Sequence, residues 1–138
     1  TSTSNFVPPD DLNSANSAPY RALAVAAVKP CMGNVIAFFT SEVNTSGAGD
    51  FIHVIAMATC VATAGLSNPC TVGQQVEGSP GPGHLYLQGN QLPGFAMNSA
   101  IFVFPNLNRG QWRFEILVGG NSHASVGYRT LVVEMFGA

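Results

Sequence analysis

The clearest pattern along the chain is a pair of apolar runs, residues 111–118 and 128–136, that are rich in β-branched and aromatic side chains. Residues 119–122 between them read Gly-Gly-Asn-Ser, a sequence typical of turns. If the second run were a free tail, its apolar side chains would face water and its backbone groups would stay unpaired. We therefore expect this last strand to lie inside a sheet and to close the fold.

The same kind of pattern predicts further strands upstream. Residues 34–40 and 51–63 are predicted to form a long hairpin around the polar turn SEVNTSGAGD, and short strands are expected near residues 84–88 and 99–104. Residues 77–84, EGSPGPGH, indicate a surface loop because proline and glycine interrupt strands. About seven or eight short strands with regular turn signals are typical of an all-β sandwich or jelly roll.

Two segments near the start of the chain are harder to assign. Residues 21–28, RALAVAAV, fit either a short helix, because alanine favours helices, or an edge strand, because the pattern alternates. Residues 1–19 are rich in serine, asparagine and proline, which indicates an arm or an irregular lead-in that could wrap a neighbouring molecule. We predict a single domain over residues 1–138.

The composition changes the picture in one respect, because the surface carries few charges. Only 9% of residues are charged and 46% are hydrophobic, whereas about 25% are charged in an average domain. Small soluble monomers rarely expose large apolar patches, so we expect a homo-oligomer. The net charge of −2 and five scattered basic residues do not favour nucleic acid, and no apolar run approaches the roughly 20 residues of a membrane span.

The three cysteines leave two interpretations open. Cys60 and Cys70 flank a Gly/Ser/Asn/Pro turn and could form a disulfide that leaves Cys31 unpaired, or all three could be buried, reduced thiols. There is no CxxC pair, and His53 and the other histidines show no ligand spacing with the cysteines, so we expect no metal and no cofactor.

No catalytic constellation is evident either. The chain contains a serine, a histidine and an aspartate, for instance Ser122, His123 and Asp50, but the serine does not lie in a GxSxG elbow. No two glutamates are clearly placed on one face for glycoside hydrolysis. We therefore expect no enzymatic activity. Trp112 could serve as a sugar-stacking platform, but a single tryptophan at a strand start more often fills the core.

Several short motifs together resemble a known family. These are GQW at residues 110–112, the Gly/Ser loop that follows, the closing strand to residue 137, and the segment NVIAFFTSEVNTSGAGDFIHVIAMAT. They are similar to the TNF-like superlectin domain of a Burkholderia lectin. The resemblance implies a trimeric jelly roll of the TNF/C1q type that binds glycans, fucosylated ones among them. We expect such a lectin to be secreted or to lie on the cell surface.

The sugar-binding residues of this family match the chain only in part. Thr71 and Ser125 correspond to family positions, whereas His53 stands where the family has a tyrosine, and the two family arginines fall near Gly94 and near residues 118–119.

Arginines on other strands could take the place of the missing pair. We predict a glycan site formed by loops and strand ends at a subunit boundary, with the ligand-binding residues Thr71, Arg113, His123, Ser125 and Arg129. The alternative is a structural or host-attachment trimeric tip, of the phage-fibre or virion type, that presents its loops to a protein partner.

Overall fold

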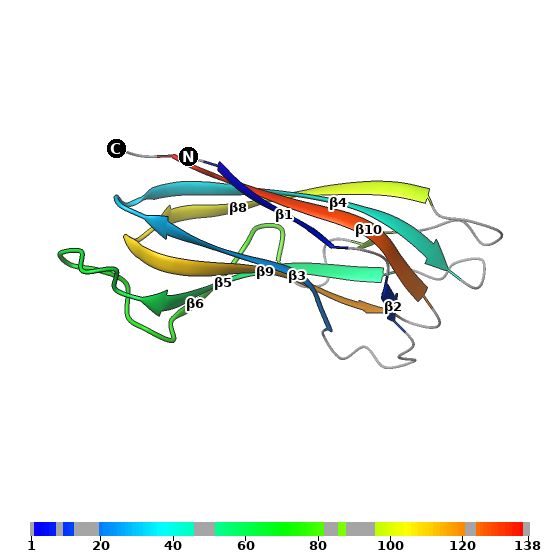
Figure 1. Cartoon of the computed structure of the whole chain (residues 1–138), viewed down its shortest axis with the longest axis horizontal. Coiled ribbons are helices and arrows are strands. Elements are labelled where there is room, and N and C mark those ends of the chain that lie inside the picture. The colour runs from blue at the N-terminus through cyan, green and yellow to red at the C-terminus, as the bar shows by residue number, and fades with distance from the viewer. Residues whose placement is uncertain are drawn as a thin grey trace.

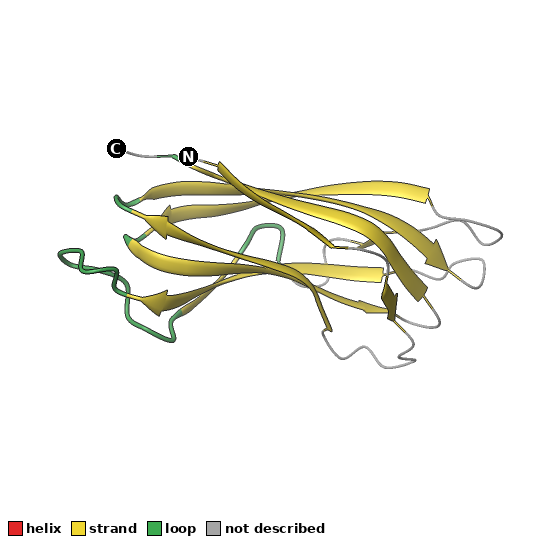
Figure 2. Ribbon diagram, in the orientation of Figure 1, coloured by secondary structure: helices red, strands yellow, loops and turns green. Residues whose placement is uncertain are grey.

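A computed structural model describes residues 2–7, 10–12, 20–45, 52–81, 86–87, 96–120 and 124–136. These residues form ten strands and no helix (Figure 2). The strands are β1 (Ser2–Val7), β2 (Asp10–Leu12), β3 (Tyr20–Lys29), β4 (Gly33–Thr45), β5 (Ile52–Ala62), β6 (Gln75–Glu77), β7 (Tyr86–Leu87), β8 (Ala96–Leu107), β9 (Gly110–Gly120) and β10 (Ala124–Met135).

The strands form two antiparallel sheets that lie one on the other (Figure 1). Sheet A has the order β1-β10-β4-β8, with β2 also paired to β10. Sheet B has the order β3-β9-β5-β6, with β7 also paired to β5. The prediction of an all-β sandwich is confirmed. The last strand, β10, lies inside sheet A between β1 and β4, as the apolar run at residues 128–136 predicted.

The predicted hairpin of residues 34–40 and 51–63 is wrong. β4 pairs with β10 and β8 in sheet A, whereas β5 pairs with β9, β6 and β7 in sheet B. The final two strands are likewise divided, with β9 in sheet B and β10 in sheet A. Apolar runs and turn residues predict where strands begin and end, but they do not distinguish a hairpin from a connection that crosses to the opposite sheet.

The start of the chain also differs from the predicted arm. β1 and β2 both pair with β10 of the same chain, so residues 2–7 and 10–12 are part of sheet A. The rest of the predicted arm lies outside the described residues. Residues 21–28 belong to β3, which decides between the two alternatives in favour of the edge strand. β4 continues to Thr45, through the first half of the expected turn.

Side chains alternate between the core and the outer faces along every long strand. Trp112, predicted to fill the core, is fully buried, and its indole Nε1 donates a hydrogen bond to the carbonyl oxygen of Asn108 at 2.8 Å. Phe104 of sheet A meets Phe114 of sheet B edge to face, with ring centroids 5.5 Å apart. The buried core also includes Val35, Phe39, Val54, Phe102, Ile116, Leu131 and Val133.

One side of the sandwich is closed where the chain leaves β6. Gly78 donates its backbone N–H to Ala56 in sheet B, and Ser79 exchanges two backbone hydrogen bonds with Val103 in sheet A. A Cβ at position 78 would lie 3.0 Å from Phe104 Cζ and 3.2 Å from Ala56 Cβ. The expected surface loop at residues 77–84 therefore includes a crossing between the sheets in which Gly78 is buried and little room is left for a Cβ.

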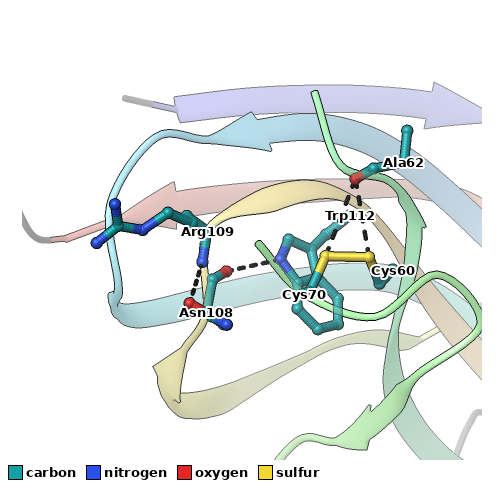
Figure 3. Close-up of a disulfide and its surroundings, with 6 residues drawn as sticks. All are labelled: Cys60, Ala62, Cys70, Asn108, Arg109 and Trp112. Carbon is teal, nitrogen blue, oxygen red and sulfur yellow. Dashed lines mark hydrogen bonds between the residues drawn. A yellow bond between two sulfur atoms is a disulfide. The ribbon is translucent and has the colours of Figure 1, made fainter. Parts of the chain in front are cut away.

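One end of the sandwich, here called the disulfide end, consists of residues 30–32, 63–74 and 108–109. Cys60 and Cys70 form a disulfide there and Cys31 is free, which agrees with the staple alternative (Figure 3). The Ala62 carbonyl oxygen lies 3.7 Å from Cys60 Sγ and 3.9 Å from Cys70 Sγ. Gly110 has φ +146°, and a Cβ at this position would overlap Cys70 Sγ.

Candidate functional site

The residues predicted to bind a glycan are spread over both sheets. Thr71 is exposed in the loop before β6, and Arg113 lies on the outer face of β9. Arg129 is in β10 and only 3% exposed, so its side chain is not available to a ligand on the surface. Ser125 is near the start of the same strand, and His123 lies outside the described residues.

Thr71 and Ser125 lie at opposite ends of the sandwich. Cys70, the neighbour of Thr71, donates its N–H to the Arg109 carbonyl at the disulfide end. Ser125 pairs with Asn44 near the other end of β4. β9 joins the two ends, and its 11 residues span about 35 Å. Within one chain, the predicted set therefore cannot contact a single sugar ring.

A polar cluster on the outer face of sheet B is made of Thr59, Arg113 and Glu115. Arg113 Nε donates to Glu115 Oε1 at 2.7 Å; the arginine side chain is 37% exposed and the glutamate 10%. Thr59 is the cross-strand partner of Arg113, and its Oγ1 is buried with no hydrogen-bond partner among the described residues. Thr71 lies in the same half of sheet B. Its carbonyl accepts a hydrogen bond from Gln74 N, and the next residue, Gln75, pairs with Thr59.

The outer face of sheet A carries a second feature, an apolar surface that we call the sheet A patch. Ile36 lies opposite Val103 on β8, and Phe38 lies between Ile101 on β8 and Val132 on β10. Ile101 is 57% exposed and Val103 36% exposed. The sheet A patch consists of Ile36, Phe38, Ile101, Val103 and Val132, and no charged residue interrupts it.

Polar residues border the sheet A patch on two sides. Glu134 pairs with Ile36 on the side of β10, and the next row of the face holds the hydroxyls of Thr40, Ser99 and Thr130. Glu42 and the strongly exposed Met97 come after that row. The arrangement is an apolar surface with a polar rim, which is the anatomy of a protein interface.

Sequence reasoning missed the sheet A patch, although a signal was present. A strand with one face in water alternates apolar and polar residues, whereas both faces of a covered strand are apolar. The segments VIAFF and AIFVF are continuous apolar runs, and in LVVEMF only Glu134 interrupts the run. From the sequence, the phenylalanines were interpreted as packing in the core or at a trimer axis, and Ile101 was not singled out; in the structure Phe38 and Ile101 lie together on the outer face.

Lys29 is a buried cation at the disulfide end. It is 2% exposed, and its Nζ donates to the carbonyl oxygen of Phe136 at 2.8 Å. Burial lowers the pKa of Lys29 from its usual value, and the charge of the neighbouring Cys31 opposes this shift. Lys29 ends β3 in sheet B, and Phe136 follows β10 in sheet A, so this hydrogen bond joins the two sheets. We therefore assign Lys29 a structural role.

Within the described ranges, no three histidine, cysteine, aspartate or glutamate side chains are grouped as a metal site requires. In the same part of the chain, no helix is long and apolar enough to cross a membrane.

No family model and no curated protein matches the chain. Among solved structures, a protein of the infectious bursal disease virus Gx strain is similar over 99% of this chain, with 11% identity and a TM-score of 0.43. The chain spans 33% of that protein. A Bacillus endospore appendage protein, described as forming disulfide-linked pili, matches 96% of this chain and 86% of its own, with 15% identity and a TM-score of 0.26. TM-scores this low do not establish a common fold, so neither similarity assigns a function.

Proposed function

We propose that this chain is a self-assembling structural module, a homo-oligomeric β-sandwich that presents its loops to a partner. The TNF-like resemblance implies a homotrimer, whereas a contact in which one face meets the same face of a second copy closes as a dimer, so the measured mass distinguishes the two forms. The observation that carries the proposal is the set of large apolar side chains on the outer face of sheet A, where Met97, Ile101 and Val103 are exposed. Exposed apolar area of this kind marks interaction surfaces in folded proteins.

The low charge of the chain supports the same proposal. With 9% charged residues and a net charge of −2, copies of the chain repel one another only weakly. The cluster of Thr59, Arg113 and Glu115 is not arranged like a catalytic site, because it lacks a nucleophile held by a base and its charges are paired. A structural role therefore accounts for more of the described residues than a catalytic one.

Light scattering on the purified protein tests the proposal. At micromolar concentration the measured mass should be a multiple of the 14.4 kDa of one chain, and a trimer would have about three times that mass. A monomer throughout the micromolar range would refute self-assembly.

Glycan binding by a lectin is a second candidate function, favoured by the polar cluster on sheet B. A sugar hydroxyl both donates and accepts hydrogen bonds, so it is the type of group that could accept from the exposed part of the Arg113 guanidinium beside Thr59. Thr71 at the same half of sheet B could add a contact. The site would be shallow and would lie on a sheet face rather than among loops.

A glycan array followed by one pair of variants tests this candidate. If a glycan binds at the polar cluster, Arg113→Ala should weaken binding by about 1–3 kcal/mol. The matched control is Arg109→Ala, which removes a guanidinium at the disulfide end. No bound glycan on the array, or equal affinities for both variants and the wild type, would reject this site.

A further inference from the structure

We infer that the sheet A patch is the surface through which one copy of this chain binds a second copy. The inference rests on the proposed function and adds to it the contact surface, which no similarity to a known protein supplies. The contact would bring the apolar rows of β4, β8 and β10 from two copies together. The polar cluster on sheet B and the loops at both ends of the sandwich would remain accessible in the assembly.

The outer face of sheet A is large enough for a contact between two copies. β4, β8 and β10 lie about 4.8 Å apart over about nine residues, or about 30 Å, and the shorter β1 adds about 20 Å of strand at one edge. The flat projection is therefore about 500 Å², and the corrugated surface of side chains is larger. A stable interface buries about 800 Å² per partner, so the outer face of sheet A is close to the area that a dimeric contact requires.

The sheet A patch contains no charged residue. No charged residue pairs directly with Phe38 or Ile101 at its centre, and the two carboxylates of this face, Glu42 and Glu134, belong to its rim. A nucleic acid, an acidic peptide or a basic peptide would each need an opposite charge at the centre. A second copy needs none, because an apolar surface complements itself.

Beside the sheet A patch, sheet A ends at β8, whose outer side no described strand pairs along residues 97–101. β8 is an edge strand, and Val103 directs its backbone N–H and C=O away from β4, toward Ser79. Residues 97, 99 and 101 have the same orientation because the β4–β8 register is regular between Val35 and Val43. No described strand pairs with β8 on this side, and residues 97–101 contain neither proline nor charge, the usual protection of an edge.

The outer face of sheet B, called outer face B, has a similar extent and also ends in an edge strand, but it carries an ion pair, so it serves as the reference. Its edge strand β3 carries Val28, which is 47% exposed and comparable in size and exposure to Ile101. The centre of outer face B is occupied by the ion pair of Arg113 and Glu115, which would have to be desolvated in a contact between copies. The two faces therefore offer a matched pair of surface substitutions.

Sedimentation velocity of Ile101→Lys and Val28→Lys tests the inference on the full chain. Both side chains are largely exposed, so both variants should fold, which circular dichroism and thermal unfolding would check. Ile101→Lys should weaken association at least tenfold and shift the protein toward the monomer, because an ammonium from each copy would be buried in the contact. Val28→Lys should assemble like the wild type.

A second substitution in the sheet A patch, Val103→Lys, keeps the test decisive if Ile101→Lys fails to fold. An oligomer that persists in Ile101→Lys and Val103→Lys would overturn the inference and leave the proposed function standing. The same holds if Val28→Lys alone dissociates. A wild type that sediments as a monomer would instead overturn the proposed function itself.

Discussion

Removal of the Cys60–Cys70 disulfide should destabilise the fold by about 3–5 kcal/mol. The bond closes a loop with a sequence separation of 10 residues, for which the chain-entropy model gives about 3 kcal/mol. Both sulfur atoms are buried, and replacing them with hydrogen in Cys60→Ala/Cys70→Ala leaves small voids that cost about 1 kcal/mol each. For a chain of this length, about 3 °C of melting temperature corresponds to 1 kcal/mol, so we expect a decrease of about 10–15 °C.

Thermal and denaturant unfolding, at one fixed protein concentration and without reductant, measure this effect. Cys31→Ser is the control, because Cys31 is free and should be replaceable with little change in stability. Alkylation of the unreduced wild type, followed by intact-mass measurement, should modify one thiol. Three modified thiols, or a double variant within 1 kcal/mol of the wild type, would refute the reasoning.

Three further substitutions probe the sandwich. Gly78→Ala should cost about 1–3 kcal/mol in unfolding free energy, because its Cβ would press on Phe104, while Gly81→Ala, with nothing closer than 3.8 Å, should change stability by less than about 0.5 kcal/mol. Trp112→Phe should cost about 2 kcal/mol, measured by denaturant unfolding, through the lost indole hydrogen bond and a cavity. Because the pKa of Lys29 is lowered in the fold, the unfolded chain binds more protons than the folded one as the pH approaches 10.5. The unfolding free energy of the wild type relative to Lys29→Met should therefore rise with pH in this range, by at most about 1.4 kcal/mol per pH unit. A difference that does not vary with pH would contradict the assignment.

The strands and the core were largely predictable from the sequence, because β-branched and aromatic runs bounded by glycine, proline and asparagine are a local signal. The buried positions of Trp112 and Phe114 follow from such runs. The pairing of strands was not predictable in the same way. β4 and β5 read as a hairpin, yet they belong to opposite sheets, since the choice depends on which partner strands complete each sheet.

The candidate site was less predictable than the fold. Arg113 and Arg129 were both predicted to bind a ligand, but Arg113 lies on an outer face, whereas Arg129, the same residue type in a similar strand, is buried. The face that a residue occupies depends on the register with its neighbours, and a shift of one position exchanges the two faces. β10 has such an irregularity between Val126 and Arg129 in its pairing with β4.

Thiol accessibility as a function of protein concentration tests the central claim most directly. In a Cys31→Ser background, Ile101→Cys and Val28→Cys each place one reactive thiol on an outer face, with Cys60 and Cys70 kept in their disulfide. If copies associate through the sheet A patch, alkylation at position 101 should slow as the protein concentration rises, while alkylation at position 28 should keep a constant rate. Equal rates at both positions over the whole concentration range, or protection at position 28 alone, would contradict the account.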